Sequence, residues 1–374
     1  MQYQVISADD HLDLRWMGRD TWTSRVEDRF KDRAPHVVQT DKGPTWMCEG
    51  RSLGRWGTQG IGTSAGRRMA LEIGGVFTDE ELRPSDQQLR LQDMDRDGID
   101  ASVIFGPIGG VLIEDSELRT ACYRAYNDWL VEFCSAAPGR LIGVGQLPAN
   151  DPATAGREFE RLAKLGIREV LLTAAVANPP IWHESWDAIW AVANETRVPV
   201  AFHLHGSETK PPGPGESLLA GIAAKILGGN MDMIEPLLRI TFSGTFEKFP
   251  NLRLVLAESG VGWIPWVLSR MDRLYEQFVD NKAYWDENGG IPLKMPPSEY
   301  FKRQVRATFE VDSVGMQLLP MIGDHCVMWG SDYPHADSTW PNSRAYLDRQ
   351  MAGVADDIRR KVTCENARVL YGLN

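Results

Sequence analysis

Residues 5–13, with the sequence VISADDHLD, predict a buried strand that ends in side chains able to bind a metal ion. The run at residues 3–8 is mostly apolar, and a carboxylate at Asp9 and an imidazole at His11 follow it. In an extended chain, residues two positions apart point to the same face, so Asp9 and His11 can hold one cation together. An oxygen ligand and a nitrogen ligand of this kind suit Zn²⁺ or Mn²⁺.

Two further carboxylates in the same stretch are alternative ligands. Asp10 points to the opposite face of a regular strand, and Asp13 lies past the predicted end of the strand. The spacing therefore favours Asp9 and His11, with Asp10 and Asp13 left open.

Apolar strand-like runs alternate with helix-like segments along most of the chain. Strands are predicted at residues 3–8, 99–105, 141–146, 168–172, 198–203, 252–257, 305–310 and 326–330. Helices are predicted at residues 89–98, 116–136, 151–164 and 184–195. Strands that alternate with helices close into a (β/α)₈ barrel when there are eight of them, and nearly continuous apolar strands fit a parallel sheet covered on both faces. We therefore predict an α/β fold, a distorted (β/α)₈ TIM barrel that forms one domain over residues 1–374.

The segment 14–85 interrupts this alternation and is predicted to be a small lid or subdomain inserted after the first strand. It is rich in Trp, Arg and Gly, and its aromatic residues argue against disorder. It is either a surface excursion held by tryptophan packing or a cap over a pocket. In a cap, an arginine such as Arg51 or Arg55 would bind a substrate carboxylate, and Arg51 is our candidate substrate ligand.

Bulk composition describes an ordinary globular protein that carries excess negative charge. The chain has 374 residues, of which 43% are hydrophobic and 24% charged, and its formal net charge is −11. This charge argues against nucleic acid or an anionic membrane surface as a partner. The five cysteines form no Cys-x-x-Cys pair, no run of 18 apolar residues occurs, and acidic residues stand where a signal peptide would be apolar. We expect a cytoplasmic protein that acts on a small molecule, with no membrane partner.

Polar residues gather at the carboxyl ends of the predicted strands, which is where barrel enzymes carry their active sites. The residues at these ends are Asp9, His11, His203, His205, Glu258, Glu310, Asp312, Asp332 and His335. A coherent set of ligands for one cation is Asp9, His11, His203 and Asp332. Three protein ligands and a water molecule are usual for catalytic zinc, and a fourth, weaker carboxylate such as Asp332 can also take a proton.

Four stretches resemble the amidohydrolase superfamily, in the branch that includes aminocarboxymuconate semialdehyde decarboxylase-like and γ-resorcylate decarboxylase-like enzymes. They are ISADDH at 6–11, VPVAFH at 198–203, residues 242–260 and GSDYPH at 330–335, and residues 365–372 follow near the end. The resemblance implies that the four candidate ligands hold one divalent metal ion, for which Zn²⁺ is our first choice and Mn²⁺ the alternative. It also implies a homodimer, because relatives often form one.

The chain departs from the family pattern at two positions. The first motif is Asp-x-His, where characterised members often have His-x-His or Glu-x-His, and this leaves the metal open. Glu258 stands where the decarboxylases have a catalytic histidine. A carboxylate can act as a base or orient water, but it cannot replace a histidine as a donor, and Glu258 could also be a structural acceptor. His205 and His335 are candidates for substrate binding.

These observations predict a metal-dependent hydrolase. In this mechanism a metal-bound water attacks an amide, ester, lactone or C–C bond of a small carboxylated or aromatic substrate, and Asp332 and Glu258 handle protons. The alternative is a non-oxidative decarboxylase of an aromatic or unsaturated carboxylic acid. Because Glu258 stands in place of the histidine, we favour hydrolysis, although a protonated glutamate could still supply the proton that decarboxylation needs. A non-catalytic scaffold is disfavoured, because the set of candidate ligands is complete.

Overall fold

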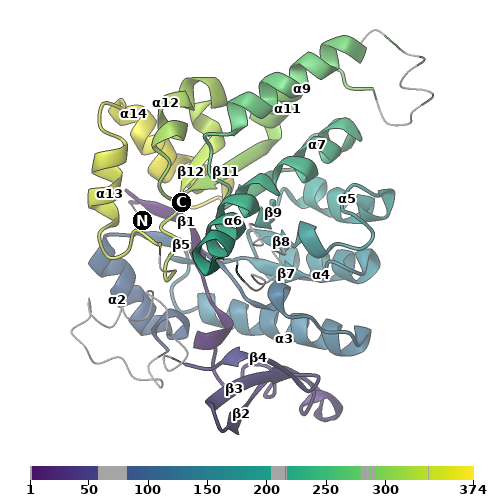
Figure 1. The fold of residues 1–374 in the computed structure, drawn as a ribbon, viewed down its shortest axis with the longest axis vertical. Coiled ribbons are helices and arrows are strands. Elements are labelled where there is room, and N and C mark those ends of the chain that lie inside the picture. The colour runs from purple at the N-terminus through teal and green to yellow at the C-terminus, as the bar shows by residue number, and fades with distance from the viewer. Residues whose placement is uncertain are drawn as a thin grey trace.

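The computed structural model describes residues 2–57, 82–203, 217–278, 292–335 and 337–374, with a few isolated positions between them. The barrel strands are β1 (Ile6–His11), β5 (Ala101–Phe105), β6 (Leu141–Gly143), β7 (Gly145–Leu147), β8 (Val170–Leu172), β9 (Val200–His203), β10 (Leu254–Ala257), β11 (Val305–Phe309) and β12 (Val327–Trp329). The helices are α2 (Gln87–Asp97), α3 (Ser116–Cys134), α4 (Pro152–Lys164), α5 (Asp187–Thr196), α6 (Leu218–Met231), α7 (Ile234–Phe242), α8 (Thr245–Lys248), α9 (Ile264–Phe278), α11 (Pro297–Gln304), α12 (Ser313–Ile322), α13 (Ser343–Gln350), α14 (Asp356–Arg360) and α15 (Asn366–Leu370). Figure 1 shows these helices packed around the strands.

The strands pair in parallel and close on themselves. Hydrogen bonds join them in the orders β1-β5-β6 and β12-β11-β10-β9-β8-β7. Only Val144 separates β6 from β7, so the two are halves of one predicted strand. On the other side, the backbone N–H of Asp332 donates to the carbonyl of Asp9 at 2.9 Å, and that of His11 donates to the carbonyl of Tyr333 at 2.6 Å. The predicted (β/α)₈ barrel is therefore confirmed.

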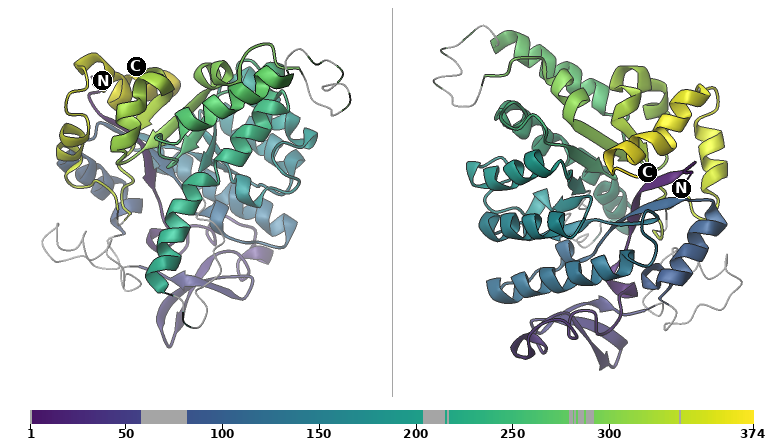
Figure 2. Two further views of the ribbon diagram at one scale, coloured as in Figure 1. Left: turned by 45° about the horizontal axis from the view of Figure 1, so that its top comes forward. Right: turned by 180° about the vertical axis from the view of Figure 1, so that it is seen from behind.

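Strand alternation divides the apolar side chains between two cores. One face points into the barrel, where small and branched side chains such as Ile6, Ala8, Val103 and Val255 are buried together. The other face packs against the helices and forms the larger core. Tyr371, just after α15, belongs to the inner core, and Figure 2 shows the two chain termini side by side at this end. Coverage on both faces explains why the strands are apolar throughout.

The predicted helices form close to their expected bounds because their caps are present in the sequence. Asp86, Asp115 and Asp151 each accept backbone N–H groups at the starts of α2, α3 and α4. The helix α2 ends at Gly98, whose φ of 73° places it in the left-handed region that glycine adopts without strain. The first strand differs from its predicted bounds of residues 3–8: β1 starts at Ile6 and continues to His11.

The inserted segment contains a small antiparallel sheet of β2 (His36–Thr40), β3 (Gly43–Cys48) and β4 (Arg51–Arg55). Figure 1 shows this sheet beside α3, outside the barrel. Buried tryptophans attach it: Trp22 packs edge-on against Trp46, and its indole N–H donates to the carbonyl of Cys122 in α3 at 3.2 Å. This packing agrees with the surface-excursion interpretation, and residues 58–81 of the segment lie outside the described part. A lid function stays a prediction.

No helix in the described ranges has the length and apolar character needed to cross a membrane.

Candidate active site

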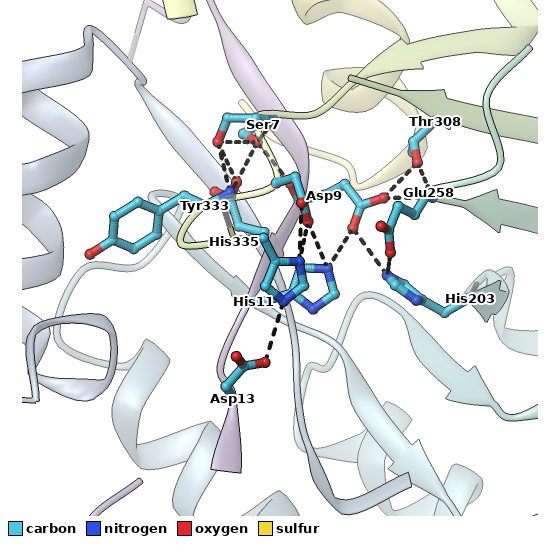
Figure 3. A network of polar contacts seen from close by, with 12 residues as sticks. Ser7, Asp9, His11, Asp13, His203, Glu258, Thr308, Tyr333 and His335 are labelled. Atoms are coloured by element: carbon cyan, nitrogen blue, oxygen red, sulfur yellow. Dashed lines mark hydrogen bonds and ion pairs between the residues drawn. The ribbon is translucent and has the colours of Figure 1, made fainter. Parts of the chain in front are cut away.

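The four candidate ligands come together at the carboxyl ends of three barrel strands. Asp9 and His11 lie in the last half of β1, His203 ends β9, and Asp332 follows β12. The Nε2 atom of His203 lies 3.3 Å from Oδ1 of Asp9, and Nε2 of His11 lies 3.2 Å from Oδ1 of Asp332. Figure 3 shows the imidazoles and carboxylates facing one another. We call this group of four residues the ligand set.

Asp9 is oriented by groups from two other strands. Its Oδ2 atom accepts the backbone N–H of Glu258 at 2.7 Å and the hydroxyl of Thr308 in β11 at 2.7 Å. These bonds leave Oδ1 directed towards His11, at 3.5 Å, and His203. Thr308 was not predicted, although a polar residue on the inner face of an apolar strand is a signal that the sequence carries.

The chemistry of the ligand set fits a divalent cation. The buried Nε2 of His11 and Oδ1 of Asp332 lie 3.2 Å apart, and neither atom makes a hydrogen bond of regular geometry within the described residues. Burial and the nearby His335 lower the pKa of His11, but Asp332 and Asp9 outweigh them and raise it to about 9. Burial raises the pKa of Asp9, but His11 and His203 hold it well below its usual range. Two carboxylate oxygens and two imidazole nitrogens suit Zn²⁺ or Mn²⁺, which would replace protons on the imidazoles.

Glu258 lies beside the ligand set, and its side chain is more exposed than those of Asp9 and Asp332. It follows β10 with a φ of 53°, and its Oε2 lies 3.6 Å from Nε2 of His203. Its side chain is 25% exposed, whereas those of Asp9 and Asp332 are 4% and 2% exposed. Burial and the Asp332 carboxylate raise the pKa of Glu258 to about 7. Among these carboxylates, Glu258 is the one placed to meet a substrate.

His335 braces the ligand set from the side opposite to His203. Its Nδ1 lies 2.8 Å from Oδ1 of Asp332, its Nε2 lies 3.3 Å from Oδ1 of Asp13, and its ring stacks on His11 at 4.1 Å between centroids. Figure 3 shows Asp13 beneath the two stacked rings. The structure thus places Asp13 as a partner of His335, and a contact of His335 with substrate stays a prediction.

Of the two other predicted substrate ligands, Arg51 and His205, the structure describes only Arg51. Arg51 lies on β4 and pairs with Glu114 at 2.8 Å and Glu49 at 3.3 Å, and it is absent from the described lining of the cavity below. His205 falls outside the described residues, so its role as a substrate ligand stays untested. Asp10 does face away from the ligand set, as strand geometry predicted, and bonds to serines.

A cavity of about 610 Å³ opens beside Asp9 and Asp332, the two carboxylates of the ligand set. Asp9, Glu258 and Asp332 form part of its wall. The described apolar residues of the wall are Leu227, Met231, Trp263, Phe309, Val311 and Val314. Three more carboxylates, Glu310, Asp312 and Asp337, also line it, and Asp337 was missed because it lies in a loop well beyond the strand end. An apolar wall that faces a cluster of polar groups is typical of a site for a small ligand.

Comparisons with known proteins agree with this site. A family model described as Amidohydrolase matches residues 23–373. The γ-resorcylate decarboxylase of Rhodococcus jostii (strain RHA1) is 27% identical over 330 residues, which cover 81% of this chain and 93% of that protein.

Two solved structures share the fold. An amidohydrolase from Mycobacterium avium subsp. paratuberculosis K-10 superposes with a TM-score of 0.74 at 20% identity, over the whole of both chains. A dihydroxybenzoic acid decarboxylase from Polaromonas sp. JS666, with bound manganese and the inhibitor 2-nitroresorcinol, has a TM-score of 0.62 at 22% identity, over 83% of this chain and 94% of that chain.

The resemblance inferred from the four sequence stretches is confirmed, since the family model spans most of the chain and the curated relative is a γ-resorcylate decarboxylase. The chain belongs to the amidohydrolase family.

Proposed function

We propose that this protein is a metal-dependent decarboxylase that releases CO₂ from a small aromatic or unsaturated carboxylic acid without an oxidant. The ligand set below a partly apolar cavity carries this proposal. Hydrolysis was our preferred prediction from the sequence, but the Rhodococcus and Polaromonas relatives are decarboxylases of aromatic acids, and they favour the alternative.

Asp9, His11, His203 and Asp332 would hold one divalent cation in this enzyme. Such a cation supplies positive charge that binds and orients a substrate carboxylate together with an adjacent hydroxyl. Manganese is bound in the Polaromonas relative, which makes Mn²⁺ our first choice, and the same donor atoms also suit Zn²⁺.

Glu258 would then supply the proton. Its protonated carboxyl group donates a proton to the ring carbon that bears the substrate carboxylate. The bond between this ring carbon and the carboxylate carbon then breaks. The electron pair of that bond returns to the ring, CO₂ leaves, and Glu258 recovers a proton from solvent. Trp263 and Met231 would pack against the ring. Asp332 stays ionised as a ligand, whereas in hydrolysis it would accept a proton from the attacking water.

Isotope incorporation separates the two reactions. The protein reconstituted with Mn²⁺ is incubated anaerobically in D₂O with 2,6-dihydroxybenzoate and related hydroxybenzoates, and in parallel with aryl esters, lactones and anilides. We expect CO₂ release and one deuterium on the vacated ring carbon, with both lost in Asp332→Asn. Turnover of an ester, lactone or amide without CO₂ release would instead establish the hydrolase.

We also propose that the protein is a cytoplasmic homodimer. The family resemblance supports the dimer, and the unpaired cysteines and acidic start support the location. Light scattering of the purified protein is the direct measurement of the dimer.

A further inference from the structure

A buried polar cluster lies behind the ligand set and takes no part in the reaction proposed above. Its members are Ser7, Asp10, Arg90, Ser102 and Ser331, and all five are buried, Arg90 completely. None of them is among the described residues that line the cavity. We call this group the Asp10–Arg90 cluster. Burying this cluster costs free energy, because the carboxylate of Asp10 and the guanidinium of Arg90 lose their hydration.

Asp10 joins the two segments that carry ligands. Both its neighbours in β1 belong to the ligand set. Its Oδ1 accepts the hydroxyl of Ser331 at 2.5 Å and the backbone N–H of Tyr333 at 3.2 Å, so it holds the residues on either side of Asp332. Ser7 donates to the same oxygen at 2.8 Å. Figure 3 shows Ser7 and Tyr333 on the side of Asp9 away from His203.

Arg90 reaches both segments from α2, outside the barrel. Its Nη1 donates to the carbonyl oxygen of His11 at 2.9 Å, and its Nη2 donates to the Ser102 hydroxyl at 3.2 Å. The Ser102 hydroxyl donates in turn to Asp10. The guanidinium also lies 5.1 Å from the ring centroid of Tyr333. Arg90 thus bonds to the backbone of His11, a predicted ligand, and packs on Tyr333, the neighbour of Asp332.

The ligand that this arrangement constrains most is Asp332. Its φ of 61° is a left-handed conformation, which costs free energy in a residue other than glycine and persists only where the surroundings hold it. Bonds from Asp10 hold both flanking residues, and the backbone N–H of Asp332 donates to the carbonyl of Asp9 at 2.9 Å.

We propose that Asp10 and Arg90 are positioning residues, which set His11 and Asp332 in the geometry that the cation requires before it binds. This inference rests on the metal site of the proposed function. Residues that orient metal ligands through hydrogen bonds commonly change metal affinity about 10- to 100-fold when they are replaced.

A matched pair of serine variants tests the proposal with metal binding as the readout. Ser102→Ala deletes the hydroxyl between Arg90 and Asp10. Ser343→Ala is the control and deletes an equally buried hydroxyl, which donates to Asp97. Asp97 lies on α2, as Arg90 does, but away from the ligand set. For each chelator-treated protein we measure the Mn²⁺ dissociation constant by calorimetry, the visible absorption spectrum with Co²⁺, which reports ligand geometry, and the metal-free melting temperature.

Ser102→Ala is expected to weaken Mn²⁺ binding about 10- to 100-fold and to change the Co²⁺ spectrum, while Ser343→Ala matches the wild type in both. Equal Mn²⁺ affinity in all three proteins, or equal loss in both variants, would overturn the proposal. Arg90→Lys is the second test, because lysine keeps the charge but lacks the planar fork, and the same two changes are expected. A wild type that binds no metal would overturn the proposed function as well, so the two failures are distinguishable.

Discussion

Glu258 illustrates how one side chain can decide the chemistry of a site. All three carboxylates line the cavity, but those of Asp9 and Asp332 are enclosed by histidines and backbone groups, whereas Glu258 contacts His203 and is 25% exposed. A group that transfers a proton must reach both the substrate and solvent. The exposure of Glu258 meets this condition, which a buried ligand does not.

Replacing Glu258 by glutamine should therefore separate turnover from metal binding. We expect kcat to fall about 10²- to 10⁴-fold, the usual contribution of a general acid, while the protein still binds Mn²⁺. Steady-state kinetics and calorimetry on the same preparation test this. Glu310→Gln is the control, because Glu310 lines the same cavity. Equal losses of kcat in the two variants would argue that only the charge of the cavity matters.

His203 is the candidate ligand contributed by β9, so it tests the assembly of the site. We expect about one equivalent of metal in the wild type and none above background in His203→Ala, because the change removes one of the two imidazole nitrogens of the ligand set, and Asp332 among the remaining residues also pairs with His335. Plasma mass spectrometry measures the metal content. His183→Ala, on an exposed loop, should bind as the wild type does. Full metal content in His203→Ala would exclude this residue from the site.

Glu169 is a buried carboxyl group inside the barrel, where it accepts the Tyr371 hydroxyl at 3.1 Å. Burial raises the pKa of Glu169 well above its usual value. The folded state then keeps a proton that the unfolded state releases, so this group lowers stability as pH rises above the unfolded pKa of about 4.5. Glu169→Gln removes the dependence. Between pH 5 and pH 8, its melting temperature should fall less than that of the wild type. Parallel curves would show that Glu169 is ionised in the fold.

At the scale of elements, closure of the barrel and assembly of the site are the same event. The segment after β12 bonds to β1 through the backbones of Asp332 and His11, and both residues belong to the ligand set. A small residue is needed where the two segments meet: a Cβ on Gly330 would lie 2.4 Å from the Cβ of Asp9. Glycine at this position is explained by close approach rather than by backbone conformation.

Gly330→Ala should accordingly push β1 and the end of β12 apart. We expect a loss of stability of about 1–3 kcal/mol, as in other overpacked cores, together with weaker Mn²⁺ binding. Chemical denaturation and calorimetry give the two quantities. Gly110→Ala is the control, since nothing lies within 4 Å of a Cβ built there. A Gly330→Ala protein as stable as this control would mean that the strands separate at little cost.

For the whole molecule, a cation held by four residues from β1, β9 and the segment after β12 should stabilise the fold. A ligand that binds only the folded state adds about 2.7 kcal/mol when its free concentration is 100 times its dissociation constant. Chelation should therefore lower the melting temperature by several degrees, and Mn²⁺ should restore it. His203→Ala should show no such shift. An unchanged melting temperature in the wild type would mean that the site contributes nothing to the stability of the barrel.

Much of the architecture was predictable because it depends on local pattern. Apolar runs separated by helix-like segments determined the number and type of the strands, and capping residues such as Asp115 and Gly98 marked where helices begin and end. The ligand set was also predictable, since a residue at the carboxyl end of a parallel strand must lie at one end of a barrel. Pairing of Asp9 with His11 needed only the two-residue period of a strand.

Other features depend on distances between segments that are remote in the chain. The sequence by itself determined the barrel and the four candidate ligands, because strand and helix periods are properties of neighbouring residues. Only the tertiary structure showed that Thr308 orients Asp9, that His335 braces Asp332, and that Arg51 pairs with glutamates on the inserted sheet. The physical reason is that hydrogen bonds and ion pairs act over a few ångströms. Closure of the barrel decides which distant side chains come within that range.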